Sequence, residues 1–479
     1  MSGTILSIIL SLSVGVLFAV LGVLHSRRKR IDLETFIANR NSTGTGFAVA
    51  SLVASIAGAW ILFSPAETGT WAGITGVIGY GIGQGMPILV LIVFGSRLRK
   101  IMPRGYSLSG FIHRRYGSVM GRFVAILMIF YMFTFLTAEL TGIAQAFSLV
   151  INIPLLATAA AIMILTLVYT VYGGLRSSIF TDFLQFLLIV PLLLIIFIAA
   201  LIFMGGSVEI SRPVEGVNSN LWNPFFRPGI EFAVVLLIAV TAANIFHQGF
   251  WQRVYACRDT GVMRRSFLIG GLVTIPVIIL TGILGIFSSE LGLVEEGKAS
   301  VALFTLLQEL PPWVLLLSLL LGLVLVMSSI DTLINGIVSI LVTRGISVER
   351  REASDRLTLL RARILTVVIA ILAVTIASRG YSVLYLFLVA DLVCSAVMFP
   401  ALYGLYATRI TGLQAMIASA AGLVAGVLFF PTPDFASWSG LPANMLYSFS
   451  IALILSALLS VLFDRLSSNK EAFSFEQEK

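Results

Sequence analysis

The chain is built from long apolar runs that are separated by short polar segments. Each run approaches the roughly 20 residues that an α-helix needs to cross the hydrocarbon core of a bilayer. No segment shows the apolar–polar alternation that is typical of strands in a membrane β-barrel. The pattern therefore predicts an all-α integral membrane protein with about 13 transmembrane helices. The predicted spans are residues 4–24, 47–70, 72–98, 121–150, 153–173, 178–204, 231–255, 265–288, 313–343, 358–378, 382–405, 411–430 and 443–464.

Composition excludes a soluble globular domain, because 58% of the 479 residues are hydrophobic and only 11% are charged. No zinc-ligand spacing, nucleophile motif or phosphate-binding glycine loop occurs, so we do not expect an enzyme. Cys257 lies beside a predicted loop and Cys394 lies inside a span. We expect neither a disulfide nor a metal pair from them.

Basic residues gather on one side of the predicted topology. If the N-terminus is outside, every Lys and Arg except Arg212, Arg227, Lys298 and Arg379 falls on the cytoplasmic side. This positive-inside pattern predicts a multi-pass protein of the inner or plasma membrane, with the N-terminus outside and the C-terminus cytoplasmic. The net charge of +8 then reflects orientation and contact with anionic membrane lipid, not nucleic acid. No obligatory protein partner is inferred.

The ninth predicted span has a polar centre, the segment Ser-Ser-Ile-Asp-Thr at 328–332. An unpaired carboxylate at bilayer depth costs roughly 2.5–3.5 kcal/mol on insertion scales, so Asp331 needs a partner. A cation, water or a neighbouring helix would supply one. The alternative is that the hydroxyls bond within their own helix and Asp331 faces a wet crevice.

Five acids lie inside predicted spans, and no basic residue clearly does. The acids are Glu67, Glu139, Asp182, Asp331 and Asp391. Because an ion pair needs both signs, we expect protonation, bound cations or water to neutralise this set. The bias favours a cation pathway.

The second predicted span combines small residues with a proline. Ala50, Ala54 and Gly58 precede Pro65 and Glu67. Proline removes a backbone donor, and a broken helix that exposes carbonyls to a cavity is how many transporters coordinate Na⁺. The alternative is that the small residues only permit close helix packing.

Four motifs in order resemble the sodium:solute symporter family. They are YSLSGFIHRRYG at 106–117, YGGLRSSIFTDFLQ at 172–185, QRVYACRD at 252–259 and MSS at 327–329. The resemblance covers about residues 30–410. It implies a leucine-transporter-like core of ten helices with broken helices, made of two inverted five-helix repeats. These repeats would be 47–204 and 231–405, with a peripheral first helix at 1–30, two peripheral helices at 411–464 and a short cytoplasmic tail at 465–479.

The resemblance also implies a sodium site. Its ligands would be the carbonyls of Ala54, Ala57 and Leu325 and the hydroxyls of Ser328 and Ser329. Carbonyls and hydroxyls are the oxygen ligands that a hard cation such as Na⁺ prefers. Asp182 matches the family's acid near the cytoplasmic exit of the ion, although it could instead pair with Arg176. Asp182 and Asp331 are therefore candidates for an exit route or a second cation site.

The resemblance places the substrate between the second, fourth and seventh spans. The candidate residues are Trp60, Ser64, Glu67, Glu139, Asn244, His247, Gln248 and Trp251. Sugar-carrying members have a glutamine where this chain has Ile61, which argues against a hexose. Glu67 and Glu139 facing one pocket would favour an amine. The alternative is that the aromatic residues only pack and Glu67 meets extracellular water.

Together these features predict a sodium-coupled secondary active symporter. It would import a small polar nitrogenous solute, such as an amino acid, urea or a polyamine, by alternating access. A proton-coupled symporter of the same fold and a solute-sensing membrane protein are the alternatives.

Overall fold

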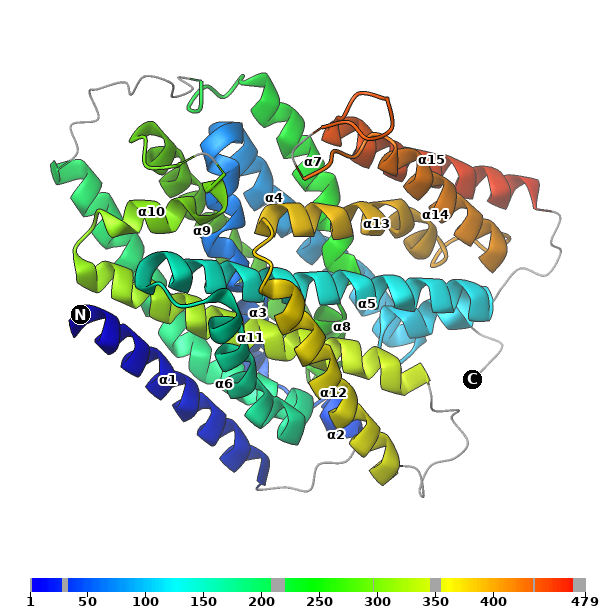
Figure 1. The fold of residues 1–479 in the computed structure, drawn as a ribbon. Helices are drawn as coiled ribbons and strands as arrows, with labels where there is room; N and C mark the ends of the chain where they lie inside the picture. The colour runs from blue at the N-terminus through cyan, green and yellow to red at the C-terminus, as the bar shows by residue number, and fades with distance from the viewer. Residues whose placement is uncertain are drawn as a thin grey trace.

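A computed structural model describes residues 2–27, 33–207, 220–295, 297–344, 355–433 and 436–467 (Figure 1). Within these ranges the chain is helical, and the one β-type pairing is an isolated bridge between Thr43 and Cys257. The predicted all-α class is confirmed. Residues 28–30 of the first basic cluster and 468–479 of the predicted tail lie outside the described residues.

Fifteen α-helices and two short 3-10 helices are described. They are α1 (Ser2–Arg27), α2 (Leu33–Ile37), α3 (Thr45–Ile56), η1 (Ala59–Leu62), α4 (Ser64–Ile101), α5 (Leu108–Ile151), α6 (Leu155–Ser207), α7 (Arg227–Ile245), α8 (Gln248–Ala256), α9 (Thr260–Glu290), η2 (Ala299–Val301), α10 (Ala302–Gln308), α11 (Pro312–Arg344), α12 (Asp355–Ala377), α13 (Val383–Tyr403), α14 (Gly412–Val427) and α15 (Met445–Leu466).

Ten helices in the described ranges are long and apolar enough to cross a membrane, so the predicted number of thirteen is not confirmed. Three features account for the difference. Helices α3 and α14 are each shorter than a full span, and α6 runs through two predicted spans. Within α6 the backbone turns at Gly174, where φ is +55°. A Cβ at this glycine would lie 2.5 Å from the ring of Phe36, so only glycine fits the turn.

Two helices are interrupted inside the bundle. Helix α3 ends at Ile56, Ala57 and Gly58 leave the helical conformation, and the short helix η1 follows before α4 begins. Pro65 lies in the first turn of α4, where its missing N–H is not needed. The predicted break in the second span therefore lies upstream of the proline. The second interruption separates α7 from α8 at Phe246 and His247.

Helix α11 forms the centre of the bundle (Figure 1). It packs against α1, α3, α5, α6, α8 and α12, and 78% of the residues in its apolar stretch are buried. In the apolar stretches of α1, α12 and α15, only 33%, 28% and 28% of the residues are buried, as expected for helices that face lipid. The polar centre of α11 is therefore enclosed by protein.

Arginines at one end of the bundle bond to carbonyls of loops and of a helix C-terminus. Arg99 donates to the carbonyl of Val254 at 2.6 Å, and Arg97 donates to that of Leu405 at 3.0 Å. Arg115 reaches the carbonyl of Ala407 at 2.7 Å. Guanidinium groups suit the unsatisfied carbonyls of helix C-termini and loops. The loops after α4, α8 and α13 therefore meet at the same end.

Candidate functional site

Two neighbouring serines of α11 point to different acids. Ser328 donates its hydroxyl hydrogen to Asp182 of α6 at 2.6 Å, and Ser329 donates to Glu139 of α5 at 2.7 Å. All four side chains are buried. The predicted polar centre of the ninth span therefore meets acids from two other helices, and does not face a wet crevice.

Asp182 is the centre of a buried hydrogen-bonded network. It accepts from Ser51 of α3 at 2.7 Å and forms an ion pair with Arg253 of α8 at 2.8 Å. Arg253 also donates to the hydroxyls of Ser51 at 3.0 Å and Thr332 at 2.9 Å, and to that of Ser55. These contacts tie α3, α6, α8 and α11 together.

The expectation that no base lies inside the bundle was wrong. The side chain of Arg253 is 3% exposed, and its acid partner Asp182 does not pair with Arg176. A continuous helix over 231–255 would have carried Arg253 towards the membrane surface. The interruption after α7 instead begins a new helix, α8, all of whose residues are buried.

Asp331 lies beside this network without a cation of its own. Ser178 donates to its carboxylate at 2.8 Å and Thr332 donates at 3.2 Å. Among the described residues, Asp182 and Asp331 share one nearby guanidinium, that of Arg253. Two ionised carboxylates would leave one buried negative charge in excess, which is costly. Either one of the acids carries a proton, or a cation binds beside them.

Glu139 caps the interruption between α3 and α4. Its carboxylate accepts from the backbone N–H of Ala59 at 2.7 Å and of Trp60 at 3.1 Å. Free N–H groups at a helix start favour a negative charge, and Glu139 satisfies two of them. A Cβ on Gly58 would lie 2.5 Å from the same carboxylate, so a larger residue there would displace the cap. Glu139 thus links α5, the interruption and, through Ser329, α11.

On the other side of the interruption, two buried residues, Ala54 and Ala57, have carbonyl groups that the helix does not use. Ala57 donates its N–H to Val53, but no described backbone hydrogen bond reaches the carbonyls of Ala54 or Ala57. Leu325 belongs to the uninterrupted α11, one turn before Ser328 and Ser329. Carbonyl and hydroxyl oxygens in a buried setting fit a hard monovalent cation.

A small cavity of about 30 Å³ lies between the two interrupted helices. It is lined by Ser55, Trp60, Tyr80, Gln84, Tyr131, Phe135, Val240, Ala243, Asn244, His247, Phe250, Phe387 and Asp391. Three predicted substrate residues, Trp60, Asn244 and His247, are among them. Ligands bind preferentially at such junctions of discontinuous helices.

The other predicted substrate residues do not line this cavity. Glu67 accepts from Ser382 at 3.0 Å, Gln248 donates to the carbonyl of Tyr106 at 2.8 Å, and Trp251 donates to that of Ile245 at 2.7 Å. Ser64 is buried in the first turn of α4, and Glu139 caps the interruption. The acid that does line the cavity is Asp391 of α13, which the sequence marked only as an acid inside a span.

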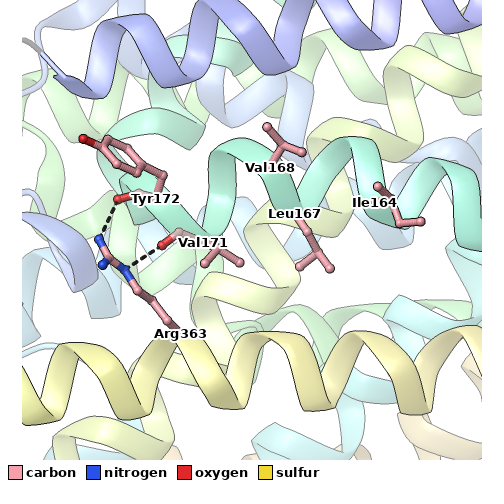
Figure 2. A pocket seen from close by; sticks show the side chains of 6 residues that line it. All are labelled: Ile164, Leu167, Val168, Val171, Tyr172 and Arg363. Carbon is pink, nitrogen blue, oxygen red and sulfur yellow. Dashed lines mark hydrogen bonds between the residues drawn. The ribbon is translucent and has the colours of Figure 1, made fainter.

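A larger groove of about 420 Å³ lies elsewhere, on the outer face of the bundle between α6 and α12 (Figure 2). Its walls are mostly apolar, and Ile164 is 61% exposed. At one end Arg363 donates to the carbonyls of Val171 at 3.0 Å and Tyr172 at 3.4 Å (Figure 2). None of the predicted site residues lines it, and its exposure is typical of a surface that lipid covers.

The Asp182–Arg253 pair yields a test of the network. We expect Arg253→Met to cost about 3–5 kcal/mol, because it leaves the buried carboxylate of Asp182 unpaired, and Asp182→Asn to cost less, because Asp331 still lies near Arg253. The double variant should lose clearly less than the sum of the two. Thermal unfolding in detergent measures this, with Glu231→Gln and Arg227→Met as the control cycle, since that pair is exposed. Simple additivity at Asp182 and Arg253 would contradict the pairing.

The chain matches the sodium:solute symporter family model over residues 35–422. The spermidine transporter DUR31 of Candida albicans is 29% identical over 398 residues, which are 82% of this chain and 74% of that protein. The osmoregulated proline transporter OpuE of Bacillus subtilis is 23% identical over 495 residues, which cover 96% of each chain.

Solved structures share the fold. A Na⁺-coupled sialic acid symporter in a substrate-bound outward-open state superimposes with a TM-score of 0.74 at 15% identity, covering 98% of this chain and 99% of that chain. Mhp1 in an inward-facing conformation gives a TM-score of 0.55 at 14% identity, covering 91% and 94%. Sequence identities of 14–15% to these two structures establish the fold alone. Membership of a family rests on the family model, which matches most of the sequence. The chain belongs to the sodium:solute symporter family.

Proposed function

We propose that this transporter is a sodium-coupled symporter that imports a small nitrogenous solute by alternating access. The observation that carries the proposal is that Glu139 bonds both to the interruption after α3 and to Ser329 of the serine pair of α11. Both provide oxygen ligands at the centre of the bundle, and both are held by buried acids.

The proposed sodium ligands are the carbonyls of Ala54, Ala57 and Leu325 and the hydroxyls of Ser328 and Ser329. A serine hydroxyl has one donor and two lone pairs. Each serine can therefore donate to its acid, Asp182 or Glu139, and still offer a lone pair to the ion. The nearby carboxylates would add favourable electrostatics without having to touch the ion.

Sodium at this position would couple ion binding to solute binding, because it would hold α3 and α11 together. Ser55 of α3 and Trp60 of η1 also line the cavity. Each ligand must then strengthen binding of the other, since coupling free energy is reciprocal. The membrane potential contributes roughly 2.3 kcal/mol per charge per 100 mV to inward transport.

The proposed orientation follows the positive-inside pattern, with the N-terminus outside a cell membrane. The end of the bundle that carries Arg97, Arg99 and Arg115 would then be cytoplasmic. Asp182 and Asp331 would lie on the ion's exit route or form a second cation site.

Relatives support the nitrogenous class of substrate. Besides the spermidine and proline transporters, a probable urea active transporter of Schizosaccharomyces pombe is 20% identical over 252 residues, half of this chain and 38% of that protein. Trp60, Asn244 and His247 would contact the solute, and Ser64, Glu67, Glu139, Gln248 and Trp251 would hold the surrounding helices in position.

Proton coupling is a second candidate for the driving ion. The observation that favours it is Asp331, a buried carboxylate that is bonded to hydroxyls but to no cation of its own among the described residues. A proton on Asp331 would remove the excess charge of the network.

Uptake into proteoliposomes separates the two ions. Radiolabelled spermidine, urea and proline are offered in NaCl or choline chloride at the same pH on both sides, and then with an inward pH gradient in choline. We expect uptake of at least one solute to require sodium and to ignore the pH gradient. Uptake driven by the pH gradient in choline would establish proton coupling instead.

Substitution of the serine pair tests the ion site directly. Ser328→Ala and Ser329→Ala each remove a proposed ligand, so the sodium concentration for half-maximal uptake should rise about tenfold or more. Ser318→Ala is the matched control, because this buried serine of α11 donates only to the carbonyl of Val314 in its own helix. Wild-type sodium dependence in both ligand variants would exclude the assigned site.

A further inference from the structure

Asp391 is a buried acid that neither the ion site nor the network uses. It lies near the middle of α13, is 5% exposed and lines the cavity between the two interrupted helices. Within the described ranges, no hydrogen bond or ion pair reaches its carboxylate; the neighbouring Ser395 donates to the backbone carbonyl instead. An acid at bilayer depth normally has a partner, so a cationic ligand is the natural candidate.

The walls around Asp391 are aromatic. Seven rings line the cavity, namely those of Trp60, Tyr80, Tyr131, Phe135, His247, Phe250 and Phe387. They contact one another, with centroids 4.7 Å apart for Phe135 and Phe387 and 5.7 Å for Trp60 and Tyr80. The negative face of an aromatic ring attracts a cation, and aromatic cages are used to bind ammonium groups.

We propose that Asp391 and this aromatic cage bind the ammonium group of a cationic amine, which is the transported solute. The inference rests on the proposed symport function and narrows its substrate class. A cavity of about 30 Å³ exceeds the roughly 10–15 Å³ that one water needs, so it has room for a single ammonium head. The amides of Gln84 and Asn244, 3.3 Å apart, lie on the same cavity wall and would meet a further polar group of the solute.

Other occupants fit the same groups less well. Sodium prefers a shell of oxygen ligands, and most of this wall consists of ring carbons. Urea has no charge to offset the carboxylate. The two acids that the sequence suggested for amine binding are engaged elsewhere, Glu67 with Ser382 and Glu139 with the backbone of Ala59 and Trp60.

Binding of radiolabelled spermidine to the purified full-length protein in NaCl tests the inference. We expect methylammonium to compete and urea not to compete at equal concentration. Asp391→Asn should weaken spermidine binding at least tenfold. Sodium bound at the proposed ion site should raise the melting temperature in NaCl over that in choline chloride, and this rise should be the same in Asp391→Asn as in wild type, which also shows that the variant is folded. Glu231→Gln is the matched control on α7, where the acid forms an exposed pair with Arg227, and it should bind within about twofold of wild type.

A second variant guards against a folding defect. Phe387→Leu removes one ring face while it keeps an apolar side chain, and it should weaken spermidine binding several-fold. Wild-type affinity in Asp391→Asn, or equal competition by urea and methylammonium, would overturn the inference. Sodium-driven uptake of urea or proline without any spermidine binding would overturn it too and leave the symport proposal intact. If no nitrogenous solute requires sodium, both proposals fall.

Discussion

A helix that breaks inside a membrane leaves backbone groups with no water to satisfy them, and this constraint organises the centre of the bundle. At the interruption after α3, the free N–H groups and the free carbonyl groups differ in their partners. The N–H groups of Ala59 and Trp60 bond to the fixed carboxylate of Glu139. The carbonyls of Ala54 and Ala57 receive no described backbone hydrogen bond. The side chain of Glu139 thus caps one side, and the proposed ion site lies on the other.

The buried polar network around Asp182 also satisfies polar groups inside the bundle. Asp182, Arg253 and the hydroxyls around them connect α3, α6, α8 and α11 through buried, charge-assisted hydrogen bonds. Such bonds are strong when complete and costly when one partner moves away. A conformational change that separates α3 from α11 must therefore replace these contacts, and an ion or proton bound there would bias which arrangement is favoured.

Much of the fold could be predicted because it depends on local patterns. Apolar runs identified the helices, and small residues near Pro65 indicated the broken second span. The site could be predicted only in part. The burial of Arg253 depends on the interruption before α8, and the roles of Glu139 and Asp391 depend on which way each helix faces its neighbours. Helix rotation and the position of a break are set by contacts between distant segments, which a single span of sequence does not encode.

The central claim is that sodium bridges the interrupted α3 and the serine pair of α11. Hydrogen–deuterium exchange of the purified protein in NaCl and in choline chloride at equal ionic strength tests it most directly. If the ion binds there, peptides that cover residues 53–63 and 325–332 should exchange more slowly in sodium, and Ser328→Ala should remove the difference. Identical exchange of both segments in the two salts would contradict the claim.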